Sequence, residues 1–237
     1  YKATRLNPNN IEAHNNFGLV SEMLGDLRGA IQGFKKTILI DPNFSDGHHN
    51  LGLSLKGMGD NVAAIESYKR AIQIDPRYFE AHNNLGNALS EVGRLEEAIK
   101  SYKTAIKINP NFAEAHFNMG NAFRSLQLHA RAIVSYKIAL EIRPNFAEAR
   151  NHIGYTHNII GETKIAIKYF EEAIKLKPDY SDAYNNLGKA FYYIGNIEDS
   201  LKAFDKAISH DANHAETYCN RAVLFLFLRQ DQKSIED

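Results

Sequence analysis

The sequence predicts an all-α protein in which helical hairpins of one repeating length stack in a line. The first observation is the spacing of proline: all six prolines lie 34 residues apart, at Pro8, Pro42, Pro76, Pro110, Pro144 and Pro178. The second is that glycine, alanine and aromatic residues recur in phase with the prolines. Self-similarity at a period of about 20 to 50 residues is the signature of a solenoid or another repeat architecture.

We number each repeat so that its proline stands at position 32. This predicts one array of six complete repeats, 11–44, 45–78, 79–112, 113–146, 147–180 and 181–214, with the end of a preceding repeat at 1–10 and a partial terminal repeat at 215–237. The first residue is Tyr1 rather than Met, and both ends of the chain fall inside the second helix of a repeat. We therefore expect the chain to be a window from a longer protein.

The first helix of each repeat is expected over about positions 1 to 14. Position 15 then reads Gly25, Gly59, Gly93, Gln127, Gly161 and Gly195. Glycine adopts the left-handed conformation at little cost and commonly ends a helix in this way. Position 2 is always Asp or Glu, which suits the first turn because a carboxylate there stabilises the helix dipole. The alternative is that this acidic row binds cations or basic peptides.

The second helix is expected over about positions 18 to 31, because the proline at 32 cannot continue it. Position 8 is glycine in all six complete repeats, positions 20 and 27 are small, and position 24 is always aromatic: Phe34, Tyr68, Tyr102, Tyr136, Phe170 and Phe204. The distance between packed helices depends on the side chains at their contact. We expect the small residues to bring the helices close together, with the aromatic ring filling the space beside them.

This pattern resembles the tetratricopeptide repeat (TPR) family, and the segment EAHNNLGNALSEVGRLEEAIKSYKTAIKINPNF, residues 80–112, carries the resemblance best. The resemblance covers the whole chain. It implies a right-handed superhelical solenoid of antiparallel helix hairpins, with the first helices lining a concave groove that binds a peptide. The departures are Gln127, Ser200, Ala212, Arg221 and Arg229, which indicate a degenerate C-terminal end.

Candidate peptide-binding residues lie at positions 6, 9 and 13, which share one stripe of the first helix with position 2. Position 6 is asparagine in most repeats, and a row of amides could pair with the backbone of an extended peptide. The alternative is that these amides make only local hydrogen bonds. An asparagine ladder of this kind is similar to that in the superhelix of O-linked N-acetylglucosamine transferases. The candidates are Asn16, Asn50, Asn84, Asn87, Asn118, Asn121, Tyr155, Asn186, Lys189 and Tyr193.

Positions 9 and 13 vary between repeats, so specificity is expected there. Tyr192 and Tyr193 are candidate anchor residues, although ordinary packing between repeats explains them equally well. The carboxylate clamp that some arrays of this family use for chaperone tails is not expected. Asn83 stands in place of its first lysine, and Glu148 and His152 replace its last two cations.

Composition excludes several other functions. Lys plus Arg and Asp plus Glu are both 28, so no net positive charge favours nucleic acid or anionic lipid. The longest apolar run, 222–228, is shorter than the roughly 20 residues of a membrane helix. One cysteine, Cys219, cannot form an internal disulfide, so a cytoplasmic or nuclear location is expected.

No cofactor, metal ion or catalytic site is expected. The histidines at position 4, His14, His48, His82 and His116, are interpreted as packing residues because equivalent positions of stacked hairpins are too far apart to share a metal ion. His152 and His157 lack a third ligand, and the glycines of 52–60 follow the repeat lattice rather than a phosphate loop.

The sequence therefore predicts a non-catalytic scaffold that binds an extended or helical peptide segment in its groove. The alternative is the substrate-recognition array of a larger enzyme, such as a glycosyltransferase similar to O-linked N-acetylglucosamine transferase. Self-association through the end helices is a third possibility.

Overall fold

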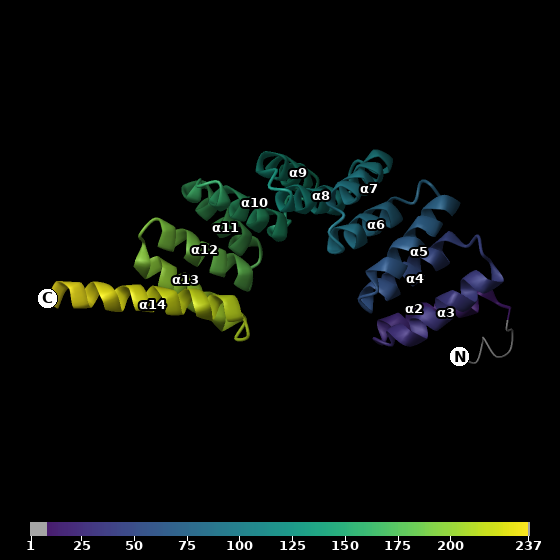
Figure 1. The fold of residues 1–237 in the computed structure, drawn as a ribbon, viewed down its shortest axis with the longest axis horizontal. Helices are drawn as coiled ribbons and strands as arrows, with labels where there is room; N and C mark the ends of the chain where they lie inside the picture. The colour runs from purple at the N-terminus through teal and green to yellow at the C-terminus, as the bar shows by residue number, and fades with distance from the viewer. Residues whose placement is uncertain (1–8, 237) are drawn as a thin grey trace. The chain divides into compact units, whose positions relative to one another are not determined.

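The structure is a computed structural model that describes the backbone of residues 9–236 and the side chains of residues 9–226. These residues form 13 α-helices and no β-strand (Figure 1). They divide between Leu126 and Gln127 into two compact units. The predicted end of a preceding repeat, 1–10, falls almost wholly outside the described residues, and the other repeat boundaries stay a prediction.

Unit 1 contains three helical hairpins followed by one further helix. Its helices are α2 (Ile11–Met23), α3 (Leu27–Ile40), α4 (Ser45–Gly57), α5 (Asn61–Ile74), α6 (Phe79–Glu91), α7 (Leu95–Ile108) and α8 (Ala113–Ser125). Each helix packs against the next along the chain, and the first helices α2, α4, α6 and α8 also contact one another in order. Unit 1 is therefore a linear stack of hairpins.

Unit 2 repeats the same arrangement. Its helices are α9 (His129–Ile142), α10 (Ala147–Ile159), α11 (Thr163–Leu176), α12 (Ser181–Tyr193), α13 (Ile197–His210) and α14 (Ala215–Glu236). Neighbours along the chain pack together, and the first helices α10, α12 and α14 contact one another in order. The predicted fold class, an all-α solenoid of antiparallel helix hairpins, is confirmed.

Left-handed residues at position 15 end the first helices as predicted. The five glycines there have φ between 77° and 84°, and Gln127 adopts the same conformation with φ of 59°. A side chain in this conformation costs roughly 1–2 kcal/mol, and the turn at Gln127 bears this cost.

The last helix differs from the sequence-based expectation. The repeat lattice places the chain end inside a second helix, with Arg229 as a departure at the position of the helix-ending glycine. Instead α14 runs without a break from Ala215 to Glu236. Arginine at position 15 lacks the conformational freedom of glycine, and at this site a continuous helix avoids the left-handed conformation.

In every hairpin that lies within one unit, the core is a contact between the glycine at position 8 and the aromatic ring at position 24. All six aromatic side chains are buried. A Cβ atom added to Gly86 would lie 2.5 Å from Cε1 of Tyr102, and the corresponding atom on Gly18 would lie 2.5 Å from Cε1 of Phe34. The alanines at position 20, from Ala30 to Ala166, are fully buried beside them. The predicted close approach of the helices is thus confirmed.

Replacing Gly86 by alanine tests this contact. The added methyl group collides with the Tyr102 ring, so we expect Gly86→Ala to lower the free energy of unfolding by about 1–3 kcal/mol. Gly57 is the matched control, because a Cβ there meets only the flexible side chain of Leu27, at 3.2 Å. Gly57→Ala should change stability by less than about 0.5 kcal/mol. Urea denaturation followed by circular dichroism measures both, and equal midpoints for the two variants would contradict the contact.

Candidate peptide-binding face

The candidate residues lie on the surface that positions 2, 6, 9 and 13 of the first helices form, which we call the first-helix face. In unit 1 it carries Asn16, Asn50, Asn84, Asn87, Asn118 and Asn121; in unit 2 it carries Tyr155, Asn186, Lys189 and Tyr193. Within each unit the first helices are neighbours, so equivalent positions form rows.

Within each unit, the asparagine at position 6 donates a hydrogen bond from its amide nitrogen to the position-5 side chain of the preceding repeat. This holds wherever the structure describes that preceding repeat. We call these the inter-repeat amide bonds. The donor–acceptor pairs are Asn50–Asn15 at 3.4 Å, Asn84–His49 at 2.9 Å, Asn118–Asn83 at 3.1 Å, Asn186–Asn151 at 3.1 Å and Asn220–Asn185 at 2.9 Å. An amide has two N–H donors and an oxygen acceptor, so one such bond leaves hydrogen-bonding capacity for a ligand.

The sequence analysis missed position 5 as the acceptor of these bonds. The available signal was that position 5 also carries a polar side chain in most repeats, although Phe117 interrupts the row. Three of the acceptors are almost completely buried, namely Asn83, Asn151 and Asn185. A buried amide oxygen needs a hydrogen-bond partner, which the next repeat supplies. The row at position 6 therefore makes local hydrogen bonds, as the alternative interpretation held, whether or not it also binds a peptide.

His49 replaces the asparagine acceptor between the second and third repeats. Its Nε2 accepts from the amide of Asn84, so the neutral ring carries its proton on Nδ1, which donates to the hydroxyl of Tyr78 at 3.0 Å. The ring also packs against Tyr68 and Tyr78. Burial lowers the pKa of His49, and the nearby Asp46 carboxylate opposes this shift only in part.

The position-4 histidines have a structural role of their own. The Nε2 atoms of His48, His82 and His116 lie 3.0, 3.1 and 3.2 Å from the carbonyl oxygen of the lattice proline six residues earlier. Arg150 donates to the equivalent carbonyl of Pro144. These side chains therefore satisfy a carbonyl at the turn between repeats, which agrees with the interpretation of packing residues rather than ligands.

Positions 9 and 13 differ between the two units. In unit 1 the Asn87 amide oxygen accepts from the hydroxyl of the core residue Tyr102 at 2.9 Å. In unit 2 the Lys189 ammonium donates to the Glu216 carboxylate at 2.9 Å, and Tyr193 is 63% exposed. Lys189 lowers the pKa of Glu216, so that carboxylate stays charged at neutral pH. At positions 9 and 13 the face therefore carries aliphatic and amide side chains in unit 1, and tyrosines with an ion-paired lysine in unit 2.

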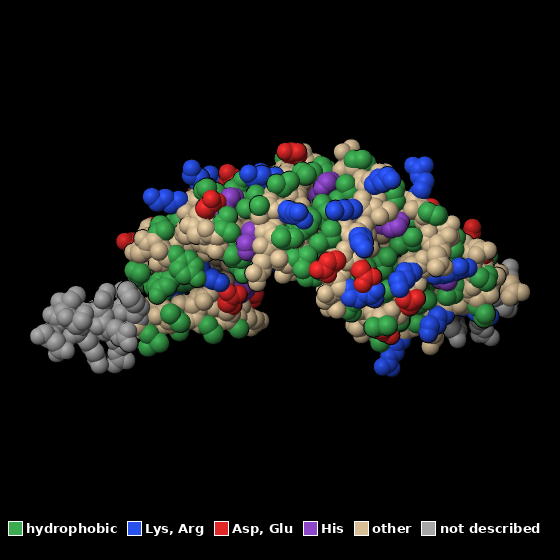
Figure 2. Space-filling model, turned by 45° about the horizontal axis from the view of Figure 1, so that its top comes forward, with side chains coloured by type: hydrophobic (Ala, Val, Ile, Leu, Met, Phe, Trp, Pro, Cys, Tyr) green, Lys and Arg blue, Asp and Glu red, His purple; other side chains and the backbone are tan. Residues whose placement is uncertain are grey.

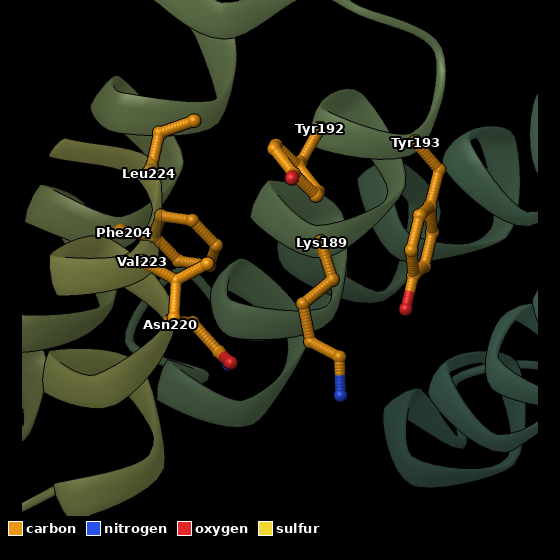
Figure 3. Close-up of a pocket in the computed structure, with 7 residues that line it drawn as sticks. All are labelled: Lys189, Tyr192, Tyr193, Phe204, Asn220, Val223 and Leu224. Atoms are coloured by element: carbon orange, nitrogen blue, oxygen red, sulfur yellow. The ribbon is translucent and has the colours of Figure 1, made fainter. Parts of the chain in front are cut away.

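Two neighbouring pockets open beside Lys189 and Tyr193 on α12. One, of about 190 Å³, lies between α12, α13 and α14, with Tyr192, Phe204, Val223 and Leu224 around it and Asn220 at its edge (Figure 3). We call it the α14 pocket.

The other pocket, of about 470 Å³, lies between α10 and α12. Its lining includes Tyr155, Asn158 and Thr163. Sequence reasoning found Tyr193, Lys189 and Tyr155, but missed Phe204 and Leu224, because those two belong to core positions of the repeat.

Surface charge and metal-ligand geometry point to no further candidate site among the described residues. Lys, Arg, Asp and Glu side chains are interspersed over the face drawn in Figure 2. Among the described residues, His, Cys, Asp and Glu nowhere gather in a group of three that could hold a metal ion. A search of the same residues finds no helix with both the length and the apolar character needed to cross a membrane.

Two family profiles match this chain. The profile described as TPR repeat matches residues 58–93, 90–127 and 159–195, and the one described as tetratricopeptide repeat matches 113–146 and 181–214. No curated protein sequence matches the chain significantly.

Several solved structures are similar to the chain. The MamA protein is 30% identical, with 71% of this chain and 92% of MamA covered and a TM-score of 0.64. YrrB, described as a TPR protein with an unusual peptide-binding site, is 22% identical, with 80% and 97% covered and a TM-score of 0.61. PilF of Pseudomonas aeruginosa is 19% identical, with 90% and 96% covered and a TM-score of 0.76.

The inter-repeat amide bonds predict a position-dependent loss of stability. Asn186→Ala removes the donor from the buried Asn151 oxygen, so we expect it to cost about 1–3 kcal/mol of unfolding free energy. Asn16 occupies the same position but is exposed, so Asn16→Ala should cost less than about 0.5 kcal/mol. Urea denaturation measures both values. A similar cost for the two variants would mean that the bond to Asn151 contributes nothing.

His49 predicts a pH dependence of stability. Its pKa is lowered in the folded state, so below its ordinary value of 6.5 the unfolded chain takes up a proton that the folded chain does not. Stability is therefore lost as pH falls from 6.5 towards the lower folded pKa. His49→Asn keeps an acceptor for Asn84 and lacks this titration, so its stability should fall less between pH 7.5 and pH 5. Denaturation midpoints of the wild type and of His49→Asn across this range measure the difference in pH dependence. The other histidines are the same in both proteins, so their contributions cancel in this difference. Parallel curves would refute the assignment.

Proposed function

Since this chain belongs to the tetratricopeptide-repeat family, we propose that it is a non-catalytic protein-interaction scaffold that binds a peptide segment on its first-helix face. The observation that carries the proposal is the row of position-6 amides. Each inter-repeat amide bond fixes the orientation of an asparagine side chain, and each asparagine keeps an N–H or oxygen that the bond does not use.

The amide row favours an extended ligand over a helical one. The backbone N–H and C=O groups of an extended peptide are free to pair with side-chain amides, whereas those of a helix are already paired within it. Amides held in place by the protein lose little conformational freedom when the ligand binds, which favours affinity. YrrB, whose description includes a peptide-binding site, has a similar fold, and this supports a peptide as ligand for a stack of such hairpins.

The alternative predicted from the sequence, a substrate-recognition array of a larger enzyme, needs the same face and the same amides. A binding experiment on this chain therefore tests the recognition step that both functions share.

The test uses peptides selected from a random phage-displayed library on the full 237-residue chain. The double variant Asn84→Ala, Asn118→Ala removes two neighbouring amides of unit 1. We expect it to weaken peptides bound there by about 1–3 kcal/mol, the net value of one or two hydrogen bonds. Fluorescence anisotropy with labelled peptides gives the dissociation constants.

Asn83→Ala provides the control. It removes the acceptor of the Asn118 amide bond and the donor of a 3.4 Å hydrogen bond to the Asn84 oxygen, but leaves the Asn118 and Asn84 side chains on the first-helix face. The control should lose stability, while it should lose less affinity than the double variant. Unchanged affinity in the double variant, for every selected peptide that binds unit 1, would remove the amide row from the proposed function.

A further inference from the structure

The α14 pocket has the size and lining of a site for one aromatic ring. Tyr192 of α12, Phe204 of α13 and Val223 and Leu224 of α14 surround about 190 Å³ (Figure 3). An engineered apolar cavity of about 150 Å³ is large enough to bind benzene. A phenyl or indole ring therefore fits the α14 pocket, whereas a basic side chain would lose its hydration there beside the ammonium of Lys189, which also lines the pocket.

The edge of the pocket joins it to the proposed peptide-binding row. Asn220 lines the pocket and is also the position-6 asparagine whose amide donates to Asn185 at 2.9 Å. A peptide whose backbone pairs with Asn220 would thus place a neighbouring side chain over the pocket. On the other side of Tyr193 lies the larger and more polar pocket between α10 and α12. Successive hairpins are roughly 10 Å apart, about the length of three residues of extended chain.

The charge beside the pocket comes from the Lys189–Glu216 ion pair. The Lys189 side chain is only 27% exposed, while the Glu216 side chain is 57% exposed. Glu216 therefore neutralises the lysine and presents its own carboxylate at the rim of the groove. On the same face, the exposed Asp182 carboxylate lies 2.8 Å from His214. An acidic ligand would have to displace Glu216 from Lys189, whereas a basic or neutral ligand would not.

From these observations we propose that unit 2 recognises an extended peptide segment with an aromatic residue flanked by neutral or basic residues. The aromatic side chain enters the α14 pocket, the peptide backbone pairs with Asn220 and Asn186, and Glu216 discriminates against acidic segments by holding Lys189. This inference rests on the proposed function and specifies its ligand class.

The absence of tryptophan from the chain allows a direct experiment. The probes are nine-residue, acetylated and amidated peptides of serine and glycine with one central tryptophan. They carry two flanking lysines, two flanking glutamates or no charge, and a peptide with serine at the centre serves as competitor. Tryptophan emission reports only on the peptide, and it shifts to the blue when the ring enters an apolar pocket. We expect saturable binding in the order basic, neutral, acidic, and no competition by the serine peptide.

Val223→Phe tests occupation of the α14 pocket. Val223 is 54% exposed, so a larger side chain is accommodated without disturbing the core, and it fills the space that the peptide ring would take. Val134→Phe is the matched control, because Val134 is 57% exposed and lies on α9, away from this pocket. Val223→Phe should weaken the tryptophan peptides about tenfold or more, while Val134→Phe should leave their affinity unchanged.

Glu216→Gln tests the charge discrimination. It leaves Lys189 without its carboxylate, so the affinity of the acidic peptide relative to the neutral one should rise about two- to fivefold. Glu198→Gln is the control, since Glu198 is another exposed acid that pairs with a lysine, Lys202, on α13. An unchanged ratio in Glu216→Gln would overturn the role of Glu216.

The other outcomes separate this inference from the proposed function. Tryptophan peptides that bind wild type and Val223→Phe equally would overturn the α14 pocket as the site, while peptide binding by the scaffold would stand. If none of the probes binds, the ligand class is wrong, and the library selection on the amide row decides the proposed function by itself. Concentration-dependent dimerisation that Val223→Phe abolishes, measured by analytical ultracentrifugation, would make a second copy of the chain the occupant and would overturn the peptide.

Discussion

The contact between the position-8 glycine and the position-24 aromatic ring determines how closely the two helices of a hairpin approach. With no side chain at Gly86, the ring of Tyr102 packs directly against the backbone of the first helix. The ring is almost completely buried, and an aromatic side chain removes a large apolar area from water. A single hairpin cannot bury its remaining apolar face, which is why the hairpins stack. This stacking does not cover the first-helix face.

The inter-repeat amide bonds add a polar connection to this apolar stack. Each joins residues 35 apart in sequence, and all but the Asn50–Asn15 bond satisfy a position-5 side chain that packing has removed from water. A buried polar group left without a partner would destabilise the stack. The position-6 amides therefore have a structural role wherever they pair with a buried position-5 side chain. Their place on the first-helix face means that the same side chains are available to a ligand. A structural role and a binding role are therefore compatible at position 6.

Unit 2 shows how a constant frame can acquire a particular binding chemistry. Its first helices share the frame of unit 1, yet Lys189 stands where unit 1 has leucine or asparagine, and Tyr193 stands where unit 1 has no aromatic residue. Because Glu216 pairs with Lys189, the chemistry of this region cannot be inferred from the lysine alone. In this pair the Glu216 carboxylate is more exposed than the Lys189 ammonium that it neutralises, so the charge facing solvent is negative. Under the proposed function, specificity depends on contacts between successive repeats as much as on the residues at the variable positions.

The sequence alone determined the period and the buried aromatic row. For every described helix before α14 it also determined the helix positions to within about a residue and the turn at position 15. All of these follow from the local spacing of proline, glycine and aromatic residues. It also indicated which helix face would carry the candidate residues. Only the tertiary structure decided that Asn84 bonds to His49, that Lys189 is paired, and that Phe204 and Leu224 border the α14 pocket. These contacts join residues from different helices, and most join different repeats. Their geometry depends on how one hairpin packs on the next, which no local pattern encodes.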